Sequence, residues 1–336
     1  MRNEEKNLAE ALKSVCSLNY PNYKILVVND RSTDSSGSIL NNLQKNDPKI
    51  NIINIDVLPE GWLGKNHALF TGYNFSTSEF MLFTDADVIF SADVLTRAMN
   101  YTTKNNLDHL TILPDIITNS SFFKAILSTF IMILTAFQRP WGARDKKSKA
   151  SMGVGAFNLV KRSAYVKAGT HRAFAMRPDD DLKLGLHLKK SGSTSDVLFG
   201  NNKLQVEWYA NLKEFIDGLM KNTFSGFNYN PWLVAVAVIG MVMGYILPIP
   251  ILLIFGNRVD IVLALAILYA QIILYWKMQG ADSKWWFGLT SIYGSAIVVY
   301  ILIRSAVKTL LKGGIIWRGT FYPLKELRRK KTSPLL

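Results

Sequence analysis

Residues 79–95, EFMLFTDADVIFSADVL, place two aspartates between two apolar runs. The apolar residues before Asp85 predict a buried strand, and the apolar run resumes after Asp87. Taken alone, the two carboxylates fit either of two interpretations. They cap a buried strand on a solvated loop, or they hold a metal ion.

The segments around this stretch alternate between strand-like and helix-like patterns up to about residue 230, which predicts an α/β domain with a doubly wound, mainly parallel sheet covered by helices. A helix is expected at residues 66–75. Strands are expected at residues 23–30, 49–56, 79–87, 109–114 and 155–162.

The first residues, MRNEEKNLAEALKSVCSL, read as a charged loop that runs into an amphipathic helix. A doubly wound domain normally begins with a strand that leads to such a loop. We therefore expect that the sequence lacks its first strand. The alternative is a domain that starts with a helix.

Three long stretches poor in charge follow, at residues 232–255, 261–276 and 285–311. A membrane-spanning helix needs about 20 apolar residues, so the first and third are long enough and the second is marginal. Residues 122–137 are shorter and include a lysine, which favours an interfacial helix. The expected organisation is a catalytic domain at 1–206 that includes this interfacial helix, an interfacial connecting helix at 207–230, about three transmembrane helices at 231–311 and a basic tail at 312–336.

Charge and cysteine content point to a membrane and a reducing compartment. The net charge is +14, with 39 basic and 25 acidic residues, and basic residues gather after the last apolar stretch. This arrangement favours an anionic membrane surface over nucleic acid. The single cysteine, Cys16, excludes an internal disulfide and suits a cytosolic catalytic part. Three crossings would place the basic tail outside, against the positive-inside tendency, so either one stretch does not cross or the tail breaks the rule.

Polar and acidic residues follow two predicted strands, at residues 29–30 and 85–87. Ligands of open α/β sheets bind beyond the carboxyl ends of strands, and paired carboxylates suit a hard divalent cation whose shell phosphates can complete. A third acidic group, residues 179–181, opens a helical pattern. These carboxylates either supply charge at a helix N-terminus or include a general base whose pKa is raised by its neighbours.

Four motifs occur in order: N-D-R-S-T-D at residues 29–34, G-K-N-H-A at 64–68, D-A-D at 85–87 and D-D-x-x-L-G at 180–185. This succession resembles the inverting family 2 glycosyltransferases with a GT-A fold. PEGWLGKNHAL and IIWRGTFYP are similar to the membrane-bound branch that includes the hopanoid-associated and diaponeurosporenoate (carotenoid) glycosyltransferases. The resemblance covers nearly the whole chain, from Arg2 to about Pro323.

The resemblance implies a site for a nucleotide-sugar donor. Asp30 would accept a hydrogen bond from the nucleotide base, usually uracil, and Glu4 would lie near the ribose or base. Asp34 would shape the same loop. Lys65 stands where the family places a basic or polar side chain near the diphosphate.

The acidic motifs receive roles in the same way. Asp87 would ligate Mg2+ or Mn2+, and Asp85 would contact the ribose or donor sugar and share in the metal site. Asp181 would be the general base, ahead of its two acidic neighbours. Asp180 replaces the family's usual glutamate, which keeps the charge and shortens the reach.

The implied reaction is a direct displacement in which a sugar passes from a nucleotide donor, with UDP expected, to a lipid-like or isoprenoid acceptor at the membrane. The Q-x-x-R-W motif of processive synthases is replaced by Val206-Glu207-Trp208-Tyr209, which favours one or few transfers to a lipid. The expected location is the plasma membrane, multi-pass, with the catalytic domain in the cytoplasm. Two alternatives remain: a nucleotidyltransferase on a related sheet, and an inactive or truncated relative that serves as a membrane scaffold. The sequence indicates no oligomeric state.

Overall fold

The computed structural model describes residues 1–278 and 284–328, and the chain divides into two compact units. Unit 1 consists of Met1–Ile116 and Gln138–Glu207. Unit 2 consists of Ile117–Phe137 and the described part of Trp208–Arg329. The chain therefore leaves unit 1 twice, once for a short excursion and once for its C-terminal third.

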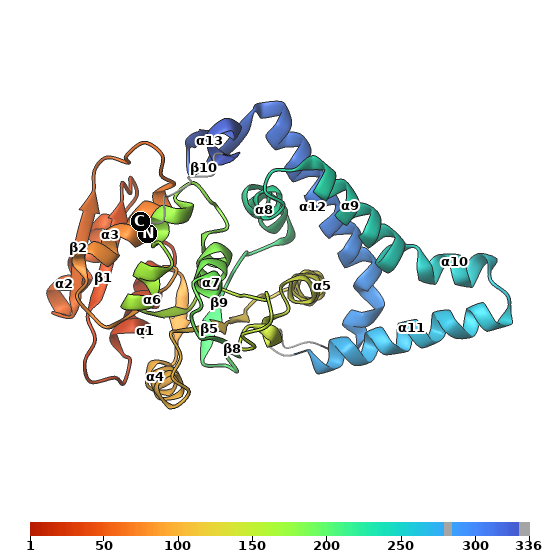
Figure 1. Ribbon diagram of the computed structural model, residues 1–336, viewed down its shortest axis with the longest axis horizontal. Helices are drawn as coiled ribbons and strands as arrows, with labels where there is room; N and C mark the ends of the chain where they lie inside the picture. The colour runs from red at the N-terminus through yellow and green to blue at the C-terminus, as the bar shows by residue number, and fades with distance from the viewer. Residues whose placement is uncertain (279–283, 329–336) are drawn as a thin grey trace. The chain divides into compact units, whose positions relative to one another are not determined.

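Unit 1 alternates strands and helices, as the sequence predicts (Figure 1). Its first half contains α1 (Leu8–Cys16), β1 (Ile25–Asp30), α2 (Ser36–Asn46), β2 (Ile50–Ile55), α3 (Gly64–Phe75), β3 (Phe80–Phe83), β4 (Val88–Phe90), α4 (Val94–Lys104), β5 (His109–Leu113) and β6 (Asp115–Ile116). Its second half contains the 3-10 turn η1 (Pro140–Gly142), β7 (Asn158–Lys161), α6 (Arg162–Lys167), the 3-10 turn η2 (His171–Phe174), α7 (Asp180–Lys190), β8 (Ser195–Phe199) and β9 (Leu204–Val206).

The described strands of unit 1 form three small sheets, one parallel and two mixed. β1 pairs with β2 in parallel, from Ile25 opposite Ile50 to Asp30 opposite Ile55. A second sheet has the order β3-β7-β5-β8 and a third the order β4-β9-β6. The pairs β5-β8 and β6-β9 are parallel, whereas β7 runs antiparallel to both β3 and β5, and β4 antiparallel to β9. The α/β class is confirmed, and β7 and β4 make its sheets mixed where the sequence pattern predicts mainly parallel pairing.

The first residue lies along β1. The Met1 amino group donates to the Val28 carbonyl at 2.7 Å, and the Asp30 amide donates to the Met1 carbonyl at 2.9 Å. These are the two bonds of a parallel strand contact. The expectation of a preceding strand stays a prediction.

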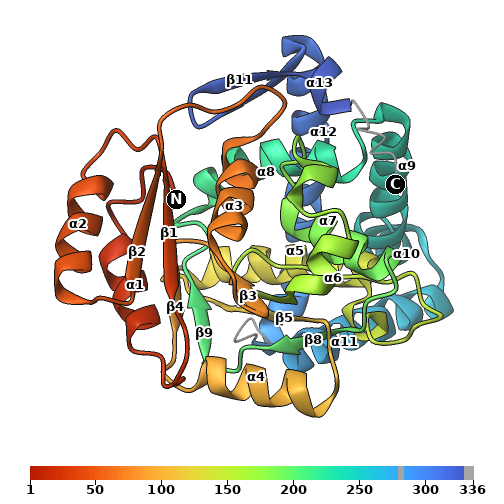
Figure 2. The same cartoon turned by 60° about the vertical axis from the view of Figure 1, so that its left-hand side comes forward.

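Apolar clusters fix the two helices that carry the motifs. α3 packs on β1 and α2 packs on β2, as Figure 2 shows around the β1-β2 pair. Behind α7, Leu184 and Leu188 are buried in a cluster with Val160 and Tyr165. Ala86 packs on the N-terminal cluster that includes Leu8 and Leu12, so the D-A-D loop is held from that side by its middle residue.

Unit 2 is helical apart from one hairpin. Its elements are α5 (Ser121–Gln138, whose last residue belongs to unit 1), α8 (Leu212–Gly226), α9 (Pro231–Met241), the π-helical turn η3 (Val242–Ile246), α10 (Pro248–Phe255), α11 (Arg258–Lys277), the 3-10 helix η4 (Trp285–Thr290), α12 (Ser291–Lys312), β10 (Gly314–Trp317), β11 (Thr320–Pro323) and α13 (Leu324–Arg328). α11 starts with a capping box between Asn257 and Asp260. α12 ends where Gly313 adopts a left-handed conformation with φ 65°.

Within the described residues, three helical segments are long and apolar enough to cross a membrane: Ser121–Gly142, Arg258–Lys277 and Trp285–Lys312. The pair Leu212–Gly226 and Pro231–Ile246 passes the same test together but is bent by 114°. The predicted boundaries at 206, 230 and 311 stay predictions. Within the predicted basic tail the chain forms a hairpin and α13, and residues 329–336 lie outside the described range.

Candidate active site

The D-A-D loop joins β3 to β4 and is anchored on residues 155–156. The Asp85 amide donates to the Gly155 carbonyl at 2.9 Å. The Thr84 hydroxyl donates to the Ala156 carbonyl at 2.9 Å. The two aspartates thus follow a strand end, and a segment some 70 residues further along fixes the start of the loop at Thr84 and Asp85.

Lys65, in the first turn of α3, bridges two acidic motifs. Its Nζ lies 2.8 Å from Asp85 Oδ1 and 3.6 Å from Asp180 Oδ1. Burial lowers the pKa of Lys65, but the attraction of Asp180, Asp85 and Asp181 outweighs burial and raises it well above its usual value. The ammonium is therefore charged throughout the physiological range.

The three consecutive aspartates at the start of α7 have three different sets of partners. Asp179 accepts from Arg177 at 2.9 and 3.0 Å and lies 3.5 Å from Lys183 Nζ. Asp180 lies against Lys65 and is 3% exposed. Asp181 accepts from the Gly155 amide at 3.0 Å and from the Leu182 amide at 2.8 Å.

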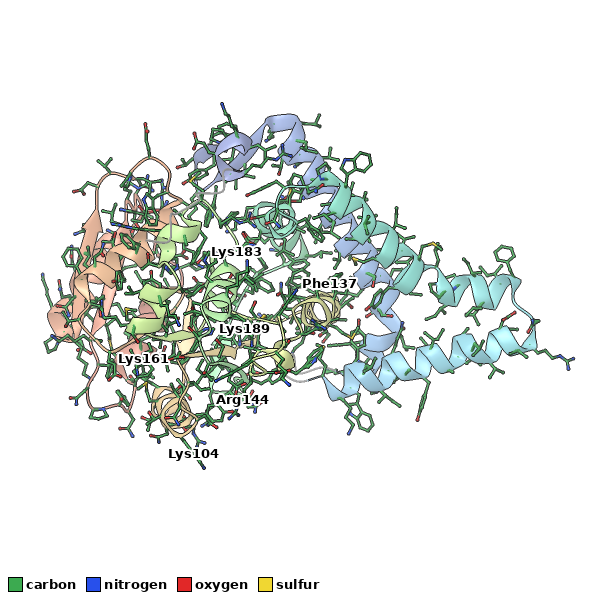
Figure 3. All side chains as sticks on the ribbon, in the orientation of Figure 1. Lys104, Phe137, Arg144, Lys161, Lys183 and Lys189 are labelled. Atoms are coloured by element: carbon green, nitrogen blue, oxygen red, sulfur yellow. The ribbon has the colours of Figure 1, made fainter. Side chains whose placement is uncertain are left out.

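These different partners bear on whether each of the three aspartates suits a structural role or a proton-accepting role. Arg177 and Lys183 form a two-cation clamp on Asp179, which suits a structural role. Figure 3 shows Lys183 and Lys189 on the ribbon of α7. Lys189 donates to the Ala143 and Asp145 carbonyls at 2.6 and 2.7 Å, so this helix is also fixed further along.

Burial dominates the protonation of the remaining carboxyls. Burial raises the pKa of Asp180 to about 7, with Lys65 lowering it and Asp181 raising it. Burial also raises the pKa of Asp181, against the opposing effect of Lys65. For Asp87, burial and then the charges of Asp85 and Glu4 raise the pKa to about 6. Carboxyls in this range can accept a proton near neutral pH.

A small cavity lies where these motifs meet. Its volume is about 10 Å3, which is room for about one water molecule. Its walls are built from α3, the D-A-D loop, residues 155–158, η2 and the start of α7. The lining residues are Lys65, Leu69, Phe83, Thr84, Asp85, Gly155, Asn158, His171, Asp180, Asp181 and Leu184.

Residues 1–169 match Glycosyl transferase family 2. The chain is a family 2 glycosyltransferase.

Relatives and a solved structure resemble the glycosyltransferase over different lengths. The 4,4'-diaponeurosporenoate glycosyltransferase of Staphylococcus haemolyticus is 22% identical over 228 residues, which are 67% of this chain and 60% of that protein. The beta-monoglucosyldiacylglycerol synthase of Nostoc sp. is 25% identical over 193 residues, 56% of this chain and 40% of that protein. The chain thus spans about 40–60% of the length of these relatives.

The mannosyltransferase PcManGT of Pyrobaculum calidifontis, solved with GDP-Man and Mn2+, is similar in fold. It superposes with a TM-score of 0.55 at 15% identity, over 93% of this chain and 85% of that one. The likeness confirms the GT-A-like fold of the glycosyltransferase.

The residues expected at the nucleotide lie around the end of β1. Both carboxylate oxygens of Asp30 accept from the Arg31 side chain, at 2.7 and 3.1 Å. Asp30 is 4% exposed, and Arg31 has a φ of 54°. A ligand at Asp30 would therefore share or displace the guanidinium of Arg31, whose pairing with Asp30 the motif alone does not specify.

Glu4 and Asp34 lie where two loops are joined. The Asp34 carboxylate accepts from the Glu5 amide at 3.2 Å and from the Ser36 amide at 3.0 Å. The Glu4 amide donates to the Ser36 hydroxyl at 2.9 Å. Asp34 thus ties the N-terminal loop to the start of α2, while the Glu4 carboxylate is close enough to Asp87 to raise its pKa.

The carboxylates of the D-A-D loop provide part of what a divalent cation needs for binding. In residues 1–278 and 284–328, no group of three or more His, Cys, Asp or Glu side chains is placed to hold a metal. Asp85 and Asp87 offer carboxylate oxygens, and the charge of Asp85 raises the pKa of Asp87 more than Lys65 lowers it. Hard oxygen ligands with uncompensated charge suit Mg2+ or Mn2+, provided that further oxygens come from the donor.

Sequence reasoning missed the glycines that let the motifs approach one another. A Cβ on Gly155 would lie 2.3 Å from Asp85 Oδ2, and one on Gly153 would lie 2.1 Å from the Asp181 carbonyl. A Cβ on Gly185 would lie 2.4 Å from the Met152 carbonyl. Only the spacing G-V-G before a predicted strand could have suggested a close backbone approach.

Sequence reasoning also missed the role of Asn66. Its side-chain amide donates to the carbonyls of Phe174, Ala175 and Arg177, at 3.0, 3.0 and 2.9 Å, and it is fully buried. The residue after Lys65 therefore fixes the segment that leads into the acidic start of α7.

Proposed function

We propose that this glycosyltransferase moves a sugar from a nucleotide donor, a UDP-sugar, to a lipid acceptor with inversion at the anomeric carbon. One observation carries the proposal. Gly155 binds both acidic motifs, accepting from the Asp85 amide and donating to the Asp181 carboxylate. Donor-binding and proton-accepting groups therefore line one cavity.

On the donor side, Asp30 and Glu4 bind the base and ribose, and Asp34 holds the loop between them. Asp85 contacts the ribose or sugar. Asp87, with Asp85, would hold Mg2+ or Mn2+, which would supply positive charge to the diphosphate. Lys65 is the protein's own counter-charge for the same group, because its ammonium lies at the D-A-D loop.

On the acceptor side, Asp181 takes the proton of the acceptor hydroxyl. The hydroxyl oxygen forms a bond to the anomeric carbon while the bond from that carbon to the diphosphate oxygen breaks. The electron pair leaves with the nucleoside diphosphate, and no covalent enzyme intermediate is needed. Asp180 lies beside Lys65 and positions it.

The cavity is too small for a sugar, so the donor sugar and acceptor occupy space that opens from it toward solvent. Asp85 is 40% exposed in its side chain and Lys65 29%, which gives both access to a ligand. Substrate binding is therefore expected to separate Lys65 from Asp85 and widen the cavity.

A lipid acceptor is supported by the activities for which two relatives are named and by the apolar helices of unit 2. The proposed location is the plasma membrane, multi-pass, with unit 1 in the cytoplasm, where nucleotide sugars are made.

The test is transfer of label from a panel of radioactive nucleotide sugars into lipid extracted from membranes that contain the protein. We expect label in lipid with a UDP-sugar. Asp181→Asn should reduce it by about 100-fold or more, as for loss of a general base. Asp145→Asn, on an exposed loop, is the matched control and should leave it unchanged. Label only in an insoluble polymer, or in no product with any donor, would refute the proposal.

A further inference from the structure

Some helices of unit 2 are long enough to span a membrane but cannot cross it, because of where the chain enters and leaves the unit. α5 is the first case, because the chain leaves unit 1 at Ile116 and returns to it at Gln138. A single crossing would place these two residues on opposite faces of the bilayer. Since both belong to one compact unit, α5 stays on the side of unit 1 although its length and composition permit a span.

α8 also belongs on that side. It follows Glu207, the last residue of unit 1, after a few residues. Four of its fifteen residues are charged: Lys213, Glu214, Asp217 and Lys221. Such a helix suits the headgroup layer and not the hydrocarbon core.

α12 is bound to both of these helices. Near its start, Gly294 lies against Thr129 of α5, where an added Cβ would be 2.4 Å from the Thr129 hydroxyl. In its second half, Arg304 lies 2.8 Å from Asp217 of α8, and the Ser305 hydroxyl accepts from the Phe224 amide at 3.3 Å. Both parts of α12 thus contact helices on the side of unit 1, and α12 also packs on α9 and η3.

α12 also differs from α11 in exposure. Of the 18 most apolar consecutive residues in Trp285–Lys312, half are buried in the protein, against 11% for the corresponding residues of α11. Its exposed apolar side chains recur at helical spacing along one face: Tyr293, Tyr300, Ile303, Val307 and Leu310. One apolar stripe with cations toward its end is typical of a helix that lies in the interface plane.

The remaining apolar helices, α9, α10 and α11, lead away from α8 and return to α5. Residues 231–255, from α9 to α10, contain no charged residue, and α11 has 20 residues, about 30 Å of helix. α10 packs on α11 (Figure 1). The excursion starts beside α8, and near its end the Tyr275 hydroxyl donates to Thr129 of α5 at 2.7 Å.

We propose that the chain crosses the membrane twice, through α9–α10 and back through α11, and that α12 lies in the interface with the C-terminal segment on the side of unit 1. This differs from the expected three crossings. The partner of the α12 stripe is the anionic lipid surface of the cytoplasmic leaflet. The inference rests on the proposed membrane placement and does not depend on the sugar or acceptor.

The distribution of charge supports this arrangement independently. The turn between α10 and α11 carries only Arg258 and Asp260 from Gly256 to Asp260, so its formal charge is zero. The other side receives the cations from the end of α11 onward: Lys277, Lys284, Arg304, Lys308, Lys312, Arg318, Lys325, Arg328, Arg329, Lys330 and Lys331. Two crossings satisfy the positive-inside rule, whereas three crossings break it.

The test is labelling of single cysteines with a membrane-impermeant maleimide in intact and in permeabilised cells. In a Cys16→Ser background, the three reporters are Asn42→Cys in unit 1, Arg258→Cys at the α10–α11 turn and Lys312→Cys after α12. All three positions are exposed. We expect Arg258→Cys to react in intact cells, and the other two only after permeabilisation.

Each other pattern overturns the inference. If Lys312→Cys reacts together with Arg258→Cys, α12 crosses. If all three react only after permeabilisation, the α10–α11 turn does not reach the far side. Lys325→Cys is a second C-terminal reporter should Lys312→Cys not accumulate. Carbonate extraction distinguishes failure of the membrane placement itself, because a protein released by carbonate is not embedded.

Discussion

Lys65 Nζ lies 2.8 Å from Asp85 Oδ1, so the cation of one motif is bound to the carboxylate of another. The pair is half open to solvent, while Asp180 on the other side of Lys65 is buried. An arriving diphosphate competes with Asp85 for the ammonium. Lys65 is therefore charged and positioned before the donor binds.

Lys65→Met should reduce transfer by about 100-fold, because a preorganised counter-charge for the leaving diphosphate is lost. The measurement is kcat and KM for the nucleotide sugar in detergent-solubilised enzyme. Lys104→Met, at the exposed end of α4, is the matched control. A change confined to KM would assign Lys65 to ground-state binding alone.

Gly155→Ala should impair activity more than stability. Its Cβ would lie 2.3 Å from Asp85 Oδ2 and 3.2 Å from Lys65 Nζ, so both side chains must move. Overpacking of this kind costs about 1–3 kcal/mol of stability, and the displaced carboxylate should lower kcat by about tenfold or more. Gly37→Ala, whose Cβ meets only one atom at 3.9 Å, is the control. Equal activities of the two variants would contradict the assigned geometry.

The rate of transfer should rise with pH and level off above about pH 7. A general base acts only after it has lost its proton, and burial raises the pKa of both Asp180, to about 7, and Asp181. Because the two carboxyls interact, the rising limb reports the pair. Asp180→Asn removes a negative neighbour of Asp181, so its rising limb should move to lower pH. A limb that stays in place or moves upward would exclude the pair as its source.

Asn66→Ala should destabilise the enzyme. The carbonyls of Phe174, Ala175 and Arg177 would each lose one hydrogen bond, although an amide still donates to Phe174 and to Ala175. Each lost hydrogen bond costs about 0.5–1.5 kcal/mol, so Tm should fall by several degrees. Asn46→Ala, which removes one exposed bond to the Asn42 carbonyl, is the control. The same Tm for both variants would show that residues 174–177 do not depend on Asn66.

Removal of divalent ions should abolish transfer. EDTA should stop the reaction, and Mg2+ or Mn2+ should restore it, because Asp85 and Asp87 offer oxygens suited to hard cations. Asp87→Asn should raise the metal concentration needed for half-maximal activity. Activity that persists in EDTA at the wild-type rate would exclude a metal from the reaction.

The local parts of this site were predictable, and the long-range parts were not. Strand ends and charge patterns locate Asp30, Asp85 and the acidic start of α7, because these features depend on neighbours in the sequence. The order of the strands in each sheet depends on contacts between distant segments. No local sequence pattern therefore indicates that β7 runs antiparallel to β3 and β5.

The same limit applies to the supporting residues. Asn66 acts through contacts with residues more than 100 positions away, which only tertiary structure creates. Arg31 binds its sequence neighbour Asp30, but the residue types alone do not specify that pairing. The hairpin of β10 and β11 illustrates a local signal that was overlooked. Arg318 and Gly319 have φ of 46° and 78°, a turn with two left-handed residues, and Arg-Gly is a weaker sequence indication of it than Asn-Gly.

The backbone link at Gly155 has a consequence for redesign of the enzyme. Both its amide and its carbonyl are used, one for Asp181 and one for Asp85, so the distance between the two motifs is set by chain length and not by a side chain. A single-residue insertion or deletion in residues 151–158 would shift one partner relative to the other. Libraries that seek new donors should therefore vary the loops after β1 and β2 and keep the length of this segment constant.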